Sequence, residues 1–308
     1  MSAREYRDTL DGRLSSQTVK LVATPSEYDE LLPSARIITG FEIDAEAVDR
    51  AANLELFACT FAGTDHLPLS AFEANDVQVT NASGVHGPNA AEQALASVLS
   101  FARGLDHGWA QSQAGTWSHY QADELYGSTV TVVGMGSIGG AIIDRLAPFG
   151  VETIGVRNSP SKGGDADTVV GIEQLPEILP RTDYLVLACP LTEETTQLVD
   201  TAALERLPPD SVVVNIARGQ VVDTDALHAA LQTNELRGAA LDVTDPEPLP
   251  DDHPLWSHNN CLITPHNAGH TPRYWDRMAD IIAENVDRLE TDEPVPYTPL
   301  TPPTKGTV

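Results

Sequence analysis

Apolar runs alternate with helical patterns along most of this chain. In the first third, apolar and β-branched residues occur at 35–39, 54–60 and 77–80, and a helical pattern occupies 45–52. Further along, helical patterns separate a second series of apolar runs, at residues 130–133, 153–156, 184–188, 211–216, 238–242 and 261–264. This alternation is typical of βαβ units around parallel sheets. We therefore predict an α/β protein with two doubly wound parallel-sheet domains.

Two long helical patterns set the expected domain boundaries. The pattern at residues 89–105 joins the first region to the second, and the pattern at residues 274–289 is expected to return to the first domain. We expect a Rossmann nucleotide-binding domain at residues 100–272, inserted into a discontinuous, flavodoxin-like substrate domain. The substrate domain would comprise residues 1–99 and 273–308 and would end in an extended, proline-rich tail.

Glycines follow the first strand of the second region in a spacing that suits a dinucleotide. The run Thr129–Val133 leads into Gly134-Met-Gly136-Ser-Ile-Gly139, and an apolar helical pattern follows. Such a loop turns tightly at its first glycine, admits a pyrophosphate at its second, and packs helix against strand at its third. We expect the phosphates at the helix N-terminus, near the amides of Ser137 and Ile138.

The charge balance is strongly acidic. The chain has 45 Asp and Glu against 18 Lys and Arg, a formal net charge of −27, and lysine occurs only at positions 20, 162 and 305. Mutual repulsion of this size is largely screened only in concentrated salt, which predicts a halophilic protein. Nucleic-acid binding is disfavoured, because it requires clustered basic residues.

Other features of the composition bear on location and redox chemistry. No apolar run approaches the ~20 residues of a membrane span, and the polar first residues do not resemble a secretory signal. We therefore expect a cytoplasmic protein that does not bind membranes. Cys59, Cys189 and Cys261 are far apart and lie in apolar runs, which indicates packing residues rather than disulfides. No metal site is predicted.

Three segments at the ends of predicted strands carry the candidate chemistry. They contain Arg218, Glu247 and His266, in residues 215–219, 242–249 and 264–269. Ligands of open α/β sheets bind at the carboxyl ends of the strands, so these side chains are expected to meet beside the dinucleotide. Arginine suits the carboxylate and carbonyl of a 2-oxo acid, and a carboxylate-oriented histidine suits the proton that accompanies a hydride. His270, just past this loop, is a weaker candidate.

The chain resembles the D-isomer-specific 2-hydroxyacid dehydrogenase family from about residue 35 to residue 289. The matching segments are Gly63-Thr-Asp65-His66, Ala91-Glu92, Gly134-x-Gly136-x-x-Gly139, Pro190-Leu-Thr192, Ala217-Arg218-Gly219, Leu241-Asp242-Val, Glu247-Pro-Leu and Thr264-Pro-His266. The resemblance implies that Arg218 binds the substrate and polarises its carbonyl. It implies His266 as the substrate-contacting general acid/base and Glu247 as its partner.

The same resemblance implies further contacts. The backbone amides of Ala62 and Gly63 would bind the substrate carboxylate, Asp242 would contact the nicotinamide amide, and Pro190 and Ala217 would lie along the cofactor. The residues that shape the rest of the substrate pocket are open, with Phe41, Phe61, Tyr274 and Trp275 as the candidates.

The predicted function is the reversible reduction of 2-oxo acids to D-2-hydroxy acids. A phosphoglycerate-type dehydrogenase is the main alternative, although such relatives often carry regulatory domains for which 308 residues leave no room. Formate dehydrogenases of the superfamily replace the acidic partner, so Glu247 argues against that activity. A dinucleotide-sensing regulator is the third alternative, disfavoured because the chain lacks a basic patch.

Cofactor choice and assembly complete the expectations. Arg157 occupies the position at which the NAD-dependent members of the family that this chain resembles have Asp, and Asn158 and Ser159 follow it. Because arginine pairs with a 2′-phosphate, we predict a preference for NADP(H), with NAD(H) as the alternative. The resemblance also implies a homodimer, with residues 106–125 as the candidate interface segment and Trp109, Trp117, Tyr120 and Tyr126 as its aromatic anchors. Packing of these aromatic residues on their own domain is the alternative.

Overall fold

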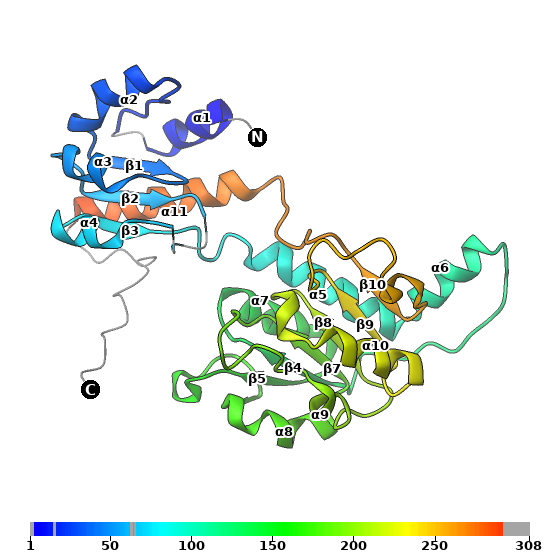
Figure 1. Ribbon diagram of the computed structural model, residues 1–308. Helices are drawn as coiled ribbons and strands as arrows, with labels where there is room; N and C mark the ends of the chain where they lie inside the picture. The colour runs from blue at the N-terminus through cyan, green and yellow to red at the C-terminus, as the bar shows by residue number, and fades with distance from the viewer. Residues whose placement is uncertain (1–2, 15–16, 62–63, 65, 292–308) are drawn as a thin grey trace. The chain divides into compact units, whose positions relative to one another are not determined.

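A computed structural model describes residues 3–14, 17–61, 64 and 66–291 (Figure 1). The chain divides into two compact units. The first comprises Met1–Val85 and Thr271–Val308, and the second comprises His86–His270. The first boundary thus falls at residue 85 instead of the expected 99, because helix α5 (Gly87–Ala102) packs against helix α7 (Ser137–Leu146) of the second unit.

The first unit has a parallel three-stranded sheet in the order β1-β2-β3. The strands are β1 (Ile37–Gly40), β2 (Leu56–Cys59) and β3 (Gln78–Thr80), and the helices are α1 (Ala3–Arg13), α2 (Pro25–Leu31), α3 (Ala45–Arg50), α4 (Leu69–Ala74) and α11 (Tyr274–Glu290). Side chains of β2 alternate between two cores. Phe57 and Cys59 pack with α3 and α4, whereas Ala58 packs with α1 and α11. Helix α11 therefore belongs to the first unit although it follows the second in sequence.

The second unit has a parallel seven-stranded sheet in the order β10-β9-β8-β7-β4-β5-β6. Its strands are β4 (Thr129–Val133), β5 (Glu152–Val156), β6 (Thr168–Val170), β7 (Tyr184–Leu187), β8 (Val212–Asn215), β9 (Gly238–Leu241) and β10 (Cys261–Ile263). Its other helices are α6 (Leu105–Gln113), α8 (Leu175–Ile178), α9 (Thr201–Leu204) and α10 (Thr224–Thr233). The strand order reverses at β4, as in a doubly wound dinucleotide-binding sheet. The predicted α/β class with parallel sheets is confirmed. Within the described residues, the strand order reverses in this seven-stranded sheet and not in the three-stranded sheet of the first unit.

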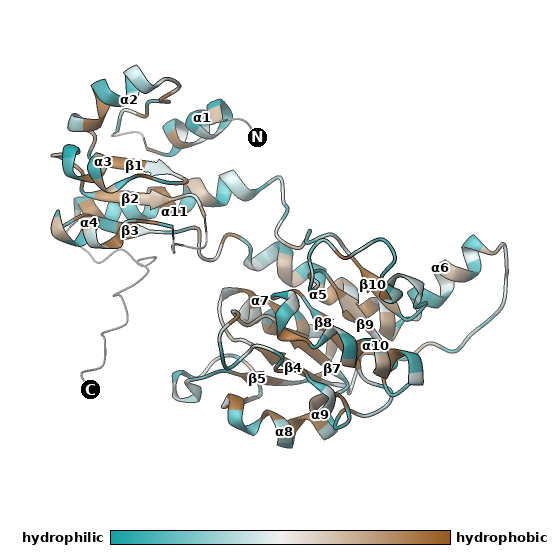
Figure 2. Ribbon diagram, in the orientation of Figure 1, coloured by the Kyte–Doolittle hydropathy of each residue, from teal (hydrophilic) through white to brown (hydrophobic). Residues whose placement is uncertain are grey.

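The central strands of this sheet are apolar on both faces, as a parallel sheet covered by helices requires. On β7, Leu185 and Leu187 face one core while Tyr184 and Val186 face the other. Figure 2 shows these strands as mainly hydrophobic. The sheet is thus a rigid platform for the loops that follow its strands.

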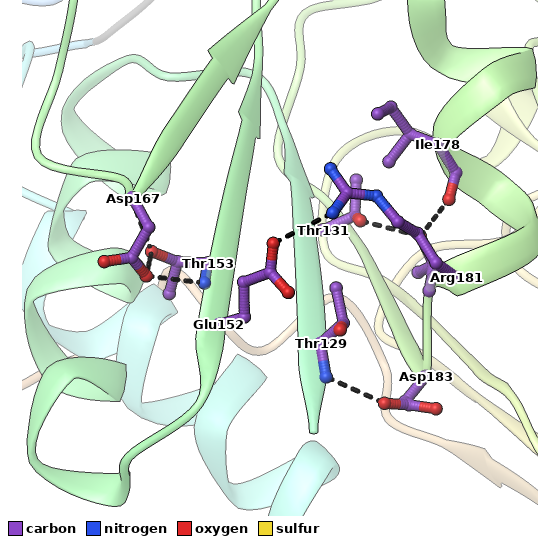
Figure 3. A network of polar contacts seen from close by, with 9 residues as sticks. Thr129, Thr131, Glu152, Thr153, Asp167, Ile178, Arg181 and Asp183 are labelled. Carbon is purple, nitrogen blue, oxygen red and sulfur yellow. Dashed lines mark hydrogen bonds and ion pairs between the residues drawn. The ribbon is translucent and has the colours of Figure 1, made fainter. Parts of the chain in front are cut away.

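Polar contacts fix the amino ends of β4 and β5, and these ends lie opposite the loops that follow the strands (Figure 3). The Asp183 carboxylate accepts a hydrogen bond from the Thr129 amide at 2.7 Å, and Asp167 accepts from both the amide and the hydroxyl of Thr153 at 2.8 Å. Arg181 donates to Glu152 at 2.9 Å between these two contacts. Strand ends that would otherwise fray are held in register.

Two elements differ from the sequence prediction. The three-residue strand β6 was not predicted, because Thr168–Val170 is too short to give a periodic signal. The predicted helix at 89–105 ends at Ala102, and α6 is a separate helix after Gly104, whose φ is +60°. The Tyr120 ring packs where a Cβ on Gly104 or Gly108 would lie, which fixes this break. None of the helices in the described part of the chain combines the length and hydropathy needed to span a membrane.

Candidate active site

The glycine loop after β4 contains two glycines that its tight packing requires and one that faces open space. Gly134 has a φ of +98°, and a Cβ there would lie 2.6 Å from the Ala188 carbonyl oxygen. A Cβ on Gly139 would lie 1.8 Å from the Gly134 carbonyl oxygen, so helix α7 approaches the loop too closely for any side chain. Gly136, in contrast, faces open space, with nothing within 4 Å of such a Cβ. The first and third glycines are required by the fold, and the second leaves room for a ligand.

The start of α7 presents hydrogen-bond donors beside Gly136. Gly136 is the N-cap residue and no described side chain caps the helix, so the first-turn amides, which include those of Ser137 and Ile138, lack a side-chain acceptor among the described residues. Helix N-terminal amides of this kind bind phosphate groups. The loop therefore fits the pyrophosphate of a dinucleotide.

His266 and Glu247 form the pair at the centre of the site. Glu247 Oε1 lies 2.6 Å from His266 Nδ1, and the two side chains are 43% and 47% exposed. Because a carboxylate only accepts hydrogen bonds, Nδ1 carries the proton of this bond and Nε2 is left for a substrate. His266 follows β10, and Glu247 lies on the segment after β9, the neighbouring strand.

Asp242 holds the loop that carries His266. This buried carboxylate accepts from the Thr264 hydroxyl at 2.5 Å, from the Asn267 amide at 2.9 Å and from the Ala268 amide at 2.8 Å. The backbone carbonyl of Asp242 also accepts from the His266 amide at 2.8 Å. This ordering role was not predicted. The sequence feature that could have indicated this role is an acidic residue directly after a buried strand, without an adjacent basic residue to pair with it.

Arg218 follows β8, the strand next to β9, and its side chain is exposed. Its guanidinium donates to the Ala217 carbonyl at 2.7 Å, and among the described residues no carboxylate lies within ion-pair distance of it. Asn215 braces this turn, because its side chain accepts from the Ala217 amide and donates to the Arg218 carbonyl, both at 3.0 Å. Arg218, Glu247 and His266 thus follow three adjacent parallel strands at one edge of the sheet.

The residues predicted to select the cofactor follow β5. Arg157 donates to the Gly163 carbonyl at 2.6 Å, and no described carboxylate pairs with it. The Asn158 amide donates to Glu194 at 2.9 Å, and Ser159 is exposed. Arg157 is therefore the residue of this trio whose charge is available for an anion.

The remaining predicted site residues lie in different surroundings. Ala217 is buried, and Pro190, exposed after β7, accepts from the Thr195 hydroxyl at 2.7 Å. Cys189 beside it is buried, and burial raises the pKa of its thiol to about 11, so it serves as a packing residue and not as a nucleophile. Ala62 and Gly63 lie outside the described residues. No group of three or more metal-ligating side chains comes together in the described part of the chain.

The second unit is therefore an α/β unit with a glycine loop of dinucleotide-binding type, and a hydrogen-bonded histidine–glutamate pair and an arginine follow the carboxyl ends of its strands. A sequence model described as the D-isomer specific 2-hydroxyacid dehydrogenase, NAD binding domain, matches residues 95–268. The chain is 33% identical over 261 residues to the human glyoxylate reductase/hydroxypyruvate reductase. The aligned region covers 82% of this chain and 80% of the human protein. The chain belongs to the D-isomer specific 2-hydroxyacid dehydrogenase family.

Solved structures of similar proteins contain either nicotinamide cofactor. A D-isomer specific 2-hydroxyacid dehydrogenase from Xanthobacter autotrophicus, solved with NADPH and MES, has a TM-score of 0.78 at 28% identity, covering 97% of this chain and 95% of the other. An NAD-dependent formate dehydrogenase from Staphylococcus aureus, solved with NAD, has a TM-score of 0.66 at 30% identity, covering 92% of this chain and 89% of the other. The family relationship thus identifies an oxidoreductase with a nicotinamide dinucleotide site.

Proposed function

We propose that this protein reduces 2-oxo acids to D-2-hydroxy acids, reversibly, and prefers NADPH. The observation that carries the proposal is the His266–Glu247 pair at 2.6 Å, which follows strands adjacent to the one preceding Arg218. A lone carboxylate–histidine pair is common in proteins. Its position at the carboxyl ends of the strands of a dinucleotide-binding sheet supports an acid–base role, as does the neighbouring arginine, which has no carboxylate partner among the described residues.

Each residue of the trio has a distinct part in the proposed reaction. When bound, the reduced nicotinamide supplies the hydride that C2 of the 2-oxo acid accepts. His266 Nε2 donates the proton that the carbonyl oxygen takes up, and in the reverse direction it removes the hydroxyl proton. Glu247 keeps Nδ1 protonated and balances the charge of the imidazolium. Arg218 binds the substrate carboxylate and stabilises the negative charge on the carbonyl oxygen, together with the proposed amides of Ala62 and Gly63.

Turnover with a panel of 2-oxo acids tests this function. We expect NADPH oxidation with at least one of pyruvate, 4-methyl-2-oxopentanoate, phenylpyruvate, glyoxylate or hydroxypyruvate, with the D-hydroxy acid as product where the product is chiral. Tight dinucleotide binding without turnover on any of them would overturn the proposal in favour of a dinucleotide-sensing protein.

The proposed preference for NADPH depends on Arg157. The Arg157 guanidinium at the end of β5 has no carboxylate partner in the part of the chain that the structure describes. Such a guanidinium suits a 2′-phosphate, whereas an aspartate there would repel it. We expect Arg157→Asp to reverse the NADPH/NADH ratio of kcat/KM, while Arg206→Asp, a change of the same charge at an exposed position after α9, leaves it unchanged. An unchanged ratio in Arg157→Asp would remove Arg157 from the cofactor site.

We also propose that α6 and the segment after it form a homodimer interface. Trp109 and Trp117 are 70% and 95% exposed, whereas Tyr120 packs on Gly104 and Gly108 of its own chain. Exposed tryptophans are enriched at the centres of protein interfaces. We expect sedimentation in molar salt to give a dimer, and Trp109→Ala with Trp117→Ala to give a monomer. A wild-type monomer at every concentration would exclude the interface.

A cytoplasmic location stays a prediction.

A further inference from the structure

The loop that follows β5 is basic in a strongly acidic chain. Residues 157–164 contain Arg157 and Lys162 but no aspartate or glutamate, although the whole chain has 45 acidic and 18 basic residues. Within this loop, the Arg157 guanidinium donates to the Gly163 carbonyl at 2.6 Å. The place of the guanidinium therefore depends on where the far end of its own loop lies.

That far end contacts Met135, the residue between the first two glycines of the glycine loop. A Cβ on Gly164 would lie 2.4 Å from the terminal methyl carbon of Met135, and a Cβ on Gly155 of β5 would lie 1.9 Å from its sulfur. The Met135 side chain thus fills the space that two absent side chains leave, one on the strand before Arg157 and one on the loop after it. It is half-buried and packs against the core of the second unit.

The loop is closed by its own backbone between these points. The Lys162 amide donates to the Ser159 carbonyl at 3.1 Å, and the Gly163 amide donates to the Pro160 carbonyl at 2.9 Å. Because these turns join the two ends of the loop, a displacement of Gly164 would also shift the carbonyl that accepts from Arg157. Met135 therefore supports the guanidinium from below without touching it.

We propose that Met135 is a positioning residue for Arg157 and thereby contributes to the discrimination between dinucleotides with and without a 2′-phosphate. This inference rests on the proposed function, since it deepens the proposed preference for NADPH. A binding group keeps its geometry only if the residues around it hold it in place. Methionine suits this task, because its unbranched thioether side chain fills irregular gaps. The glycine loop then serves two parts of the cofactor, the pyrophosphate at Gly136 and the 2′-phosphate through Met135.

Binding of NADP⁺ and NAD⁺ in the absence of a 2-oxo acid tests this role, because the two dinucleotides differ only in the 2′-phosphate. Titration calorimetry at one fixed KCl concentration gives the ratio of their dissociation constants. We expect the wild-type protein to bind NADP⁺ more tightly. Met135→Ala should lower this preference by ~10-fold, about the contribution of one charge-assisted hydrogen bond. Met135→Leu, which conserves the side-chain volume, should keep most of it.

Gly155→Ala tests the same contact from the strand. Gly155 has the extended backbone of β5, which alanine adopts without strain, but the added methyl group would take the place of the Met135 sulfur. We expect this variant to lower the preference for NADP⁺ as Met135→Ala does. In the double variant, the methyl group lies in the cavity that Met135 leaves, so the combined loss should be smaller than the two single losses predict.

Two controls distinguish positioning from general destabilisation. Leu99 on α5 is also partly buried against the same core, so Leu99→Ala should lower the melting temperature and leave the preference for NADP⁺ unchanged. In an Arg157→Ala background, Met135→Ala should not change the preference further, because Met135 acts through Arg157.

The outcomes separate this inference from the proposed function. Equal affinity of the wild-type protein for NAD⁺ and NADP⁺ overturns both the proposed cofactor preference and the inference. A wild-type preference for NADP⁺ that Met135→Ala and Gly155→Ala leave unchanged overturns the inference alone. The same holds if these variants weaken both dinucleotides equally, or if Met135→Ala still changes the preference without Arg157. Absence of turnover on every 2-oxo acid overturns the proposed reaction and leaves the inference intact.

Discussion

His266 has a backbone conformation that few residues other than glycine adopt. Its φ is +52°, in the left-handed region, where histidine is more frequent than most side chains but still uncommon. The His266 amide holds this conformation by donating hydrogen bonds to the Asp242 and Thr264 carbonyls, and the Asp242 carboxylate accepts from the amides of the next two residues. The loop thus orients the ring independently of the Glu247 hydrogen bond, and such precise orientation is what the proposed proton transfer needs.

Substitutions of the pair should show that Glu247 acts through His266. We expect His266→Ala to lower kcat by at least ~10²-fold and Glu247→Gln by about 10²-fold, because the second loses the charge that stabilises the imidazolium. In the double variant, the loss should equal that of His266→Ala alone, since residues that act as a unit are not additive. Single-turnover NADPH oxidation measures each rate.

His270 provides the matched control for this prediction. Its side chain is exposed, close to the same loop, so His270→Ala should retain full activity. Full activity in His266→Ala, or additive losses in the double variant, would show that another group transfers the proton.

Sequence and structure agree at this scale only where chemistry dictates the residue type. The positions of Arg218, Glu247 and His266 after three adjacent strands could be selected from the sequence, because few other residue types suit the proposed 2-oxo acid; their catalytic roles stay predictions. The contacts of Asp242 could not be predicted, since they depend on the left-handed backbone conformation of His266, which no propensity encodes. Its predicted contact with the nicotinamide amide stays a prediction, and its place in the structure is that of a positioning residue.

At the scale of elements, the junction of β4 and α7 determines whether a dinucleotide can bind. Gly139 and Gly140 are neighbours at the start of α7, yet their surroundings are opposite. A Cβ on Gly139 would overlap the Gly134 carbonyl oxygen, whereas a Cβ on Gly140 would meet nothing within 4 Å. Of these two glycines, Gly139 is therefore the one through which α7 packs against β4 and its loop.

This contrast gives a paired prediction. We expect Gly140→Ala to stabilise the protein by about 0.5–1 kcal/mol, because alanine restricts the unfolded chain and favours the helix. Gly139→Ala should destabilise it by about 1–3 kcal/mol through overpacking and weaken dinucleotide binding, since α7 must move away from the loop. Urea unfolding and fluorescence titration with NADPH measure the two effects. Equal behaviour of the two variants would contradict the close approach of α7 to the loop.

The elements were predictable to the extent that their apolar faces were long enough. Strands such as Val212–Asn215, buried on both sides, give continuous apolar runs that no other element explains. Strand β6 and the break at Gly104 were not predictable, because a three-residue edge strand and an aromatic ring packed on glycine both depend on tertiary contacts. The fold class follows from local pattern, and its exact boundaries follow from packing.

At the scale of the whole molecule, acidic side chains far outnumber the basic side chains that could form ion pairs with them. The formal net charge is −27, and the ion pairs in the described residues are largely on the surface, such as Arg36–Glu55 at 2.7 Å with both side chains nearly half exposed. Exposed pairs contribute ~0–1 kcal/mol each and weaken with salt. The unpaired carboxylates repel one another at low salt over a Debye length of ~10 Å at 0.1 M. Screening therefore removes more repulsion than attraction.

We accordingly predict that the folded protein is more stable in molar salt than in dilute buffer. At 1 M the Debye length falls to ~3 Å, so the melting temperature should rise steadily between 0.1 M and 2 M KCl. A variant with Glu193, Glu205, Asp251 and Asp252 replaced by lysine, all exposed positions, should need less salt to reach the same melting temperature. Potassium chloride is preferred to sulfate, because sulfate strengthens apolar burial in any protein. A melting temperature that is independent of KCl would show that the carboxylates are too widely spaced to repel one another appreciably. A rise of the same size in the lysine variant would instead show that the gain does not come from screening.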